Sequence, residues 1–202
     1  GTFNGILNNE IKRSCSKVLK VDLSDSNGIN NLIDFTIKHK PMNIVYLPGY
    51  VDNYSLFNNS IESIHKTFNI NLFGFWLLIS KACDYMKKNN YGRFLSISSI
   101  GSKFGGGNNK FNYTTSKKLL EFFPKDYKRL AEHNVFVNNL ICGATDSPLF
   151  FNKKKETIEE RINKIPVKRI AKPEEIAINC FRLCSPENTF QTLSNTTIAG
   201  GE

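Results

Sequence analysis

Short segments rich in β-branched and aromatic residues alternate with longer segments of helical periodicity along nearly the whole chain. The strand-like segments are residues 17–25, 43–50, 92–99, 134–143 and 194–201. Strands separated by helices of this length pair in parallel, because a crossover helix returns the chain to the same edge of the sheet. The alternation therefore predicts an α/β fold in which helices cover both faces of one parallel sheet.

The segments between these strands have helical periodicity, and prolines mark where some of the predicted helices end or bend. Apolar residues recur at helical spacing over 28–40, where Pro41 ends the run. A long helix is predicted from about residue 60 to 88, and another over 113–132 with a bend at Pro124. Neither an internal repeat nor a linker interrupts the pattern, so we expect residues 1–202 to form a single domain.

Charge and hydropathy narrow the classes of partner. The net charge is +9, which favours an anionic partner, but the basic residues are scattered and not interleaved with aromatic side chains. We therefore expect no nucleic acid to bind. The longest apolar run, near residues 72–79, is too short to span a bilayer, so no membrane partner is expected either.

The five cysteines contain no CxxC pair and are not accompanied by a histidine cluster, so no metal site is expected. Free thiols are typical of a reducing compartment, which favours the cytoplasm. The five are Cys15, Cys83, Cys142, Cys180 and Cys184.

The segment YTTSK contains a chemically suggestive pair. Tyr113 and Lys117 are four residues apart, so they share one face of a helix, and Ser99 ends the strand before it. An ammonium group near a phenol lowers the phenol pKa, and a serine hydroxyl can hydrogen-bond to an oxygen in the same site. Together they predict a device for proton exchange with an alcohol or carbonyl oxygen. The alternatives are an ordinary surface pair, and Ser98 in place of Ser99, although Ser98 should point to the opposite face of the strand.

The ordered set of residues extends this pair. Asn71 precedes the strand that ends at Ser99, Tyr113 and Lys117 follow, and the next strand ends at Gly143. In this arrangement the chain resembles the short-chain dehydrogenase/reductase family, of the kind typified by 3-oxoacyl-carrier-protein reductases. The likeness extends from about residue 17 to 201 and includes the segments VDLSD, VKRIAKPEEIA and AGG.

The resemblance implies a Rossmann-like, doubly wound parallel sheet and NAD(P)-dependent hydride transfer between a nicotinamide cofactor and a carbonyl or alcohol. Tyr113 would be the general acid and base, and Lys117 would lower its pKa and bind the nicotinamide ribose. Ser99 would hold the substrate oxygen, and Asn71 would maintain a helix kink and a proton-relaying water. The resemblance also implies a homo-oligomer, either a dimer or a tetramer.

The same resemblance implies a cofactor site that accepts NAD or NADP, and the basic excess favours NADP. The implied cofactor-binding residues are Gly1, Gly5, Ile6, Asp22, Gly49, Tyr113, Lys117, Gly143, Thr145 and Ser147.

Two departures from the family pattern concern cofactor binding. Leu7 stands where the last glycine of the phosphate-binding fingerprint is expected, and few residues separate Ile6 from the next strand, so the N-terminal βαβ part is apparently incomplete. Pro48, which lacks an amide donor, replaces a residue of the family's NNAG motif. These departures leave open a weak or inactive family member that binds ligand or serves as a structural subunit. The substrate also stays open between a small carbonyl compound and a carrier-linked one.

Overall fold

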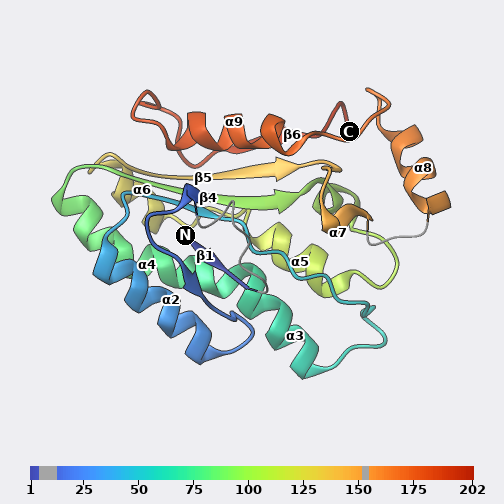
Figure 1. Cartoon of the computed structure of the whole chain (residues 1–202), viewed down its shortest axis with the longest axis horizontal. Helices are drawn as coiled ribbons and strands as arrows, with labels where there is room; N and C mark the ends of the chain where they lie inside the picture. The colour runs from blue at the N-terminus through green and yellow to red at the C-terminus, as the bar shows by residue number, and fades with distance from the viewer. Residues whose placement is uncertain (5–12, 152–154) are drawn as a thin grey trace.

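The computed structural model describes residues 1–4, 13–151 and 155–202, and its centre is a parallel sheet of four strands (Figure 1). The strand order is β3-β4-β5-β6, and each neighbouring pair is parallel. These strands are β3 (Asn43–Tyr46), β4 (Gly92–Ser99), β5 (Val135–Cys142) and β6 (Asn195–Ile198). The predicted parallel α/β fold is confirmed.

The N-terminal part forms a separate, smaller sheet. Strand β1 (Thr2–Phe3) pairs in parallel with β2 (Leu19–Lys20), and neither strand joins the main sheet. The strand predicted over 17–25 is therefore only two residues long. Val21 and Leu23, which follow β2, nevertheless pack into the main core. The two N-terminal strands thus lie outside the main sheet.

Helices cover both faces of the main sheet, with α9 on one side and α2, α4 and α5 on the other (Figure 1). The helices and helical turns are α2 (Ser26–His39), α3 (Ile61–Phe68), η1 (Asn69–Phe73), α4 (Gly74–Lys88), η2 (Ile100–Phe104), α5 (Phe111–Leu119), α6 (Asp126–Ala131), α7 (Pro148–Phe151), α8 (Lys155–Lys164) and α9 (Pro173–Cys184). Among those that the structure describes, none combines the length and apolar character needed to cross a bilayer.

The helix expected from 60 to 88 is present, and it contains the π-helical turn η1, in which one extra residue per turn shifts the helix phase around Asn71. Another helix prediction needs correction. The helix expected over 113–132 is two helices, because α5 ends at Leu119 and α6 begins at Asp126. Pro124 lies between them, and its missing N–H and rigid ring explain a break in place of a bend.

The main core lies between the sheet and the helices α2 and α4. Its most deeply buried side chains include Leu72, Ala82 and Met86 from η1 and α4, each with no exposed surface. Full burial of a large apolar side chain contributes about 1.5–3 kcal/mol to stability. A second cluster beneath α9 includes Leu95 of β4 and Leu140 of β5. The two clusters fix the central strands from both faces.

Because the strands are parallel, the carboxyl ends of β3, β4 and β5 lie at one edge of the sheet. Pro48 and Gly49 follow β3, Ser99 ends β4, and Gly143 follows β5. Residues far apart in the sequence therefore meet at this edge, where α5 also begins.

Candidate active site

The last two residues of β4 present their hydroxyl groups to different partners. Ser98 is buried, donates to Glu121 (Oγ to Oε1, 3.2 Å) and accepts from Asn139 (Nδ2 to Oγ, 3.3 Å). The Ser99 hydroxyl accepts from the amide of Gly101 at 3.3 Å and lies near enough to the Tyr113 hydroxyl to favour its ionised form. The prediction that Ser98 points away and Ser99 faces Tyr113 agrees with this geometry.

Tyr113 lies in the first turn of α5 and is partly buried. Burial raises the pKa of Tyr113 above its ordinary value, the Ser99 hydroxyl offsets part of the rise, and Cys142 adds to it. The phenol therefore keeps its proton at neutral pH. The sequence-based expectation that Lys117 gives this phenol a lowered pKa is wrong for this structure, because burial is the largest effect.

Lys117 lies one turn further along α5 and is buried. Its Nζ donates to the carbonyl oxygens of Pro48 (2.9 Å) and Ile97 (2.8 Å), which belong to the ends of β3 and β4. Burial lowers the pKa of Lys117 to about 8. An ammonium group has three donors, so these two bonds leave one N–H for a further acceptor.

Asn71 occupies the π-helical turn and has no exposed surface. Its Oδ1 accepts from the amide of Tyr50 (2.7 Å), and its Nδ2 donates to the Tyr50 carbonyl (3.0 Å). The same Nδ2 donates to the hydroxyl of Ser116 (2.9 Å), which in turn donates to the carbonyl of Tyr113 (2.8 Å). The helix irregularity predicted at Asn71 is present, and Asn71 is linked to Tyr113 through one side chain.

The sequence analysis did not single out Ser116, although it connects two of the four predicted catalytic residues. The signal was available, since Ser116 lies three residues after Tyr113 and therefore on the same side of the helix. Tyr50 was also missed, and no local pattern marks it, because it contributes only its backbone groups to Asn71.

The predicted cofactor residues that follow β3 border a large cavity. Gly1 and Gly49 both line a cavity of about 930 Å³, which follows the outer edge of β3 and is walled by α2 and the N-terminal segment. A Cβ atom built at Gly49 would lie 3.9 Å from Lys117 Nζ and 4.0 Å from Leu149 Cδ2, which is ordinary contact. The backbone of Gly49 is therefore accessible beside Lys117.

The predicted cofactor residues that follow β5 lie in a short turn. A Cβ at Gly143 would lie 2.7 Å from the Cα of Ala199, so the close approach to the segment after β6 requires glycine. Thr145 Oγ1 donates to the Gly143 carbonyl (3.1 Å), and Ser147 Oγ donates to the Thr145 carbonyl (3.2 Å). These hydroxyls hold the turn, and each oxygen can still accept a hydrogen bond.

Asp22 is exposed in the turn after β2. Its Oδ1 accepts from the Ser24 amide at 2.9 Å, and this bond is the main reason why its pKa is lowered. Gly5 and Ile6, predicted to bind the cofactor, lie outside the described residues. The residues predicted to bind the nucleotide are thus spread over a wide surface, whereas Asn71, Ser99, Tyr113 and Lys117 lie together.

Cys142 is paired with Ser99 across β4 and β5 and influences both Tyr113 and Lys117. Burial raises the pKa of its thiol to about 12, so it is an inert, space-filling group at neutral pH. Within the described parts of the chain, no group of three or more histidine, cysteine or acidic side chains is arranged to hold a metal ion.

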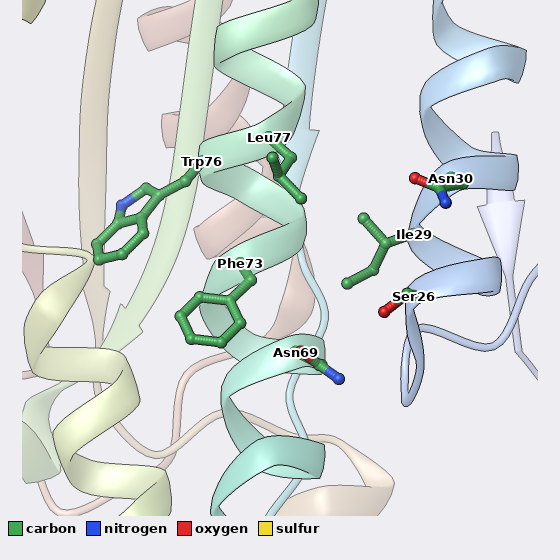
Figure 2. A pocket seen from close by; sticks show the side chains of 7 residues that line it. All are labelled: Ser26, Ile29, Asn30, Asn69, Phe73, Trp76 and Leu77. Carbon is green, nitrogen blue, oxygen red and sulfur yellow. The ribbon is translucent and has the colours of Figure 1, made fainter.

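Another cavity, of about 340 Å³, lies between α2 and the η1–α4 helix (Figure 2). Ile29 of α2 points toward Phe73 and Leu77 across this space. None of the predicted catalytic or cofactor-binding residues lines it. The chemistry is therefore expected at the carboxyl edge of the sheet, away from this cavity.

Comparison with known sequences shows which proteins the chain is similar to. Residues 6–202 match the family model described as enoyl-(acyl carrier protein) reductase. The chain is 30% identical over 208 residues to glucose 1-dehydrogenase 2 from Bacillus subtilis, covering 95% of this chain and 77% of that protein. It is also 30% identical over 141 residues to the 3-oxoacyl-acyl-carrier-protein reductase FabG from Thermotoga maritima, covering 69% of this chain and 57% of that protein. The second match thus spans little more than half of its relative.

Solved structures agree on the fold. A short-chain dehydrogenase family protein from Francisella tularensis matches with a TM-score of 0.80 and 26% identity over 92% of this chain and 80% of that chain. The 3-oxoacyl-(acyl-carrier-protein) reductase from Agrobacterium tumefaciens, crystallised with NADP, matches with a TM-score of 0.84 and 20% identity. That match covers 100% of this chain and 83% of the other.

Proposed function

The chain belongs to the short-chain dehydrogenase/reductase family, and from this premise we propose that it transfers a hydride between a nicotinamide cofactor and a carbonyl or alcohol substrate, with Tyr113 as general acid and base. The observation that carries the proposal is that Ser99 lies close enough to Tyr113 to influence its pKa, with Lys117 one helical turn away. Two neighbouring hydroxyls can both reach one substrate oxygen.

The proton chemistry follows from the pKa of Tyr113. Because burial raises this pKa, the residue is a protonated phenol at neutral pH and is ready to donate to a developing alkoxide. In the reverse direction the phenol must first lose its proton, which a raised pKa opposes. At neutral pH the residue is therefore in the form that donates a proton when a carbonyl is reduced. Ser99 holds the substrate oxygen in either direction.

The residues beside Tyr113 fit a nicotinamide cofactor. Lys117 keeps one donor for a ribose hydroxyl, and the open backbone at Gly49 lies beside it. Thr145 and Ser147 offer hydroxyl oxygens after the end of β5, and Asp22 offers an exposed carboxylate after β2. When bound, the cofactor supplies or accepts the hydride. The basic charge of +9 favours the additional phosphate of NADP over NAD.

The substrate class stays within carbonyl compounds and alcohols. One candidate is a 3-keto group on an acidic carrier protein, which the basic charge favours and which the name of the Thermotoga relative describes. The other is a small sugar or alcohol, as in the name of the Bacillus relative. We propose in addition that the protein works as a homo-oligomer, dimer or tetramer, and that its free thiols place it in the cytoplasm.

The test is oxidation of NADPH and NADH, followed at 340 nm against a panel of 3-ketoacyl, sugar and small carbonyl substrates, for the parent protein and Tyr113→Phe. We expect turnover in the parent, a preference for NADPH, and a large loss in the variant. Cofactor binding without turnover of any substrate in the parent protein would contradict the proposal.

That outcome would favour a second function, a family member that binds nucleotide without catalysis. The observation behind it is that Lys117 donates to the carbonyl of Pro48, a residue that offers no amide donor in return. A titration of intrinsic fluorescence with NADPH separates a binding protein from one that no longer binds the cofactor.

A further inference from the structure

Alternate residues of the segment after β3 contact the predicted active site. The Pro48 carbonyl accepts from Lys117, and both backbone groups of Tyr50 bind Asn71. Asp52 is next in this series, and it is a buried acidic residue with 3% of its surface exposed. A buried carboxylate is costly, so its partners indicate what it does.

The Asp52 carboxylate joins two helices. Its Oδ2 accepts from Ser63 Oγ (2.9 Å) and Thr67 Oγ1 (3.2 Å), both in α3. The same oxygen accepts from Asn112 Nδ2 (2.5 Å) in α5. Asn112 directly precedes Tyr113 in the sequence and has no exposed surface.

The start of α5 is held by the same segment and not by a cap of its own. Lys110, the N-cap residue, makes no side-chain capping bond; its Nζ donates instead to the Asp52 carbonyl (3.0 Å) and to Asn53 Oδ1 (2.5 Å). The amide of Phe111 donates to the Tyr54 carbonyl (3.1 Å). The first turn of α5, which carries Tyr113, is therefore anchored to residues 52–54.

One further observation argues against a purely stabilising role for this carboxylate. Its second oxygen, Oδ1, is buried and has no hydrogen-bond partner among the described residues. A buried oxygen without a partner has lost its hydration and gained no bond in return, which costs stability. The carboxylate therefore brings a disadvantage in stability that the links to Ser63 and Thr67 alone do not explain.

We propose that Asp52 is a positioning residue for the reaction. Through Asn112 it fixes the first turn of α5 and so sets where the Tyr113 hydroxyl lies relative to Ser99. This inference rests on the proposed function of Tyr113. It assigns to Asp52 no contact with substrate or cofactor.

The test compares Asp52→Asn with Thr67→Val in steady-state kinetics, NADPH binding and amide hydrogen exchange. Asp52→Asn keeps the shape of the side chain but replaces the charged acceptor of the Asn112 amide by a weaker, neutral one. Thr67→Val also keeps its shape and removes one hydrogen bond to the same carboxylate from α3. We expect Asp52→Asn to lower kcat about tenfold and to leave KM for NADPH within about twofold, because the proton donor is misplaced. We expect Thr67→Val to change kcat by less than about twofold.

Hydrogen exchange gives a readout that does not depend on turnover. In Asp52→Asn we expect faster exchange of α5 amides such as Thr114, which donates to the Lys110 carbonyl at 2.9 Å. In Thr67→Val these amides should exchange as in the parent protein.

The possible failures are distinguishable. A parent protein that turns over no carbonyl substrate contradicts the proposed function. An active parent whose kcat falls equally in the two variants, or whose α5 amides exchange at the parental rate in Asp52→Asn, overturns the role of Asp52 alone.

Discussion

The carboxyl edge of β4 and the N-terminal part of the chain are built very differently. At the edge of β4, Asn71 and Lys117 are buried, and each is held by two or more hydrogen bonds. In the N-terminal part, β1 and β2 are two residues long, and Gly1 and Asp22 are exposed. The difference shows that the groups predicted to move the proton are fixed by the interior, whereas Gly1 and Asp22, the N-terminal residues predicted to bind the nucleotide, lie in a thin and accessible layer.

The variant Tyr113→Phe tests most directly whether the buried residues at the edge of β4 carry the reaction. Removing the general acid should lower kcat about 10²–10⁴-fold while leaving NADPH affinity within about twofold, since the ring still packs against its neighbours. Stopped-flow turnover and fluorescence titration measure the two quantities. Tyr127→Phe is the matched control, because burial also raises the pKa of Tyr127 (to about 12) and it lies outside the site. An equal loss in both variants would remove Tyr113 from the mechanism.

The pH dependence of protein stability tests whether the amine of Lys117 is buried. Its pKa is about 8 in the folded protein and near its ordinary 10.5 when unfolded, so between these values the unfolded chain binds the additional proton. Stability contributed by this residue therefore rises with pH across that window, by at most about 1.4 kcal/mol per pH unit. Urea unfolding from pH 7.5 to 10.5 should show this slope in the parent relative to Lys117→Met. Equal slopes would mean that the amine is not desolvated.

Two glycines at the sheet edge sharpen the comparison further. Gly143→Ala should destabilise the protein by about 1–3 kcal/mol, because the new methyl would lie 2.7 Å from the Cα of Ala199. Gly49→Ala, where the nearest atom is 3.9 Å away, should leave the unfolding free energy nearly unchanged but weaken NADPH binding. Denaturant melts and titrations distinguish the two. A destabilised Gly49→Ala protein would show that this residue serves packing and not ligand access.

Asp22→Asn should have the smallest effect. The carboxylate is exposed, and its lowered pKa comes mainly from the Ser24 amide, so stability should change by less than about 0.5 kcal/mol at pH 7. NADPH affinity should fall about two- to threefold if the N-terminal layer binds the nucleotide. Unchanged affinity would limit the cofactor site to the residues around Lys117.

Much of the fold could be predicted because its signals are local. Alternation of strand and helix predicts the parallel sheet, and the two-residue period of a strand separates Ser98 from Ser99. Helical spacing places Lys117 one turn after Tyr113. These statements need only the order of residues along one element.

The errors concern effects of tertiary packing. Spacing alone suggested that Lys117 lowers the pKa of Tyr113. Burial raises the pKa of Tyr113 instead, and this burial depends on how α5 packs against the sheet. The role of Tyr50 was likewise invisible, because backbone groups carry no residue signature. The position of the disruption at Pro124 could be predicted from the sequence. Whether the helix would bend or break there could not, and the structure shows a break between α5 and α6.

Because Ser98 and Ser99 are adjacent at the end of β4, the register between β4 and β5 decides which of the two hydroxyls faces Tyr113. Ser99 lies opposite Cys142, and a shift of β4 by one residue would exchange the directions of Ser98 and Ser99. Deleting one amino acid within β4 would put Ile100 where Ser99 stands, and inserting one would put Ser98 there. The length of β4 therefore decides which side chain faces Tyr113.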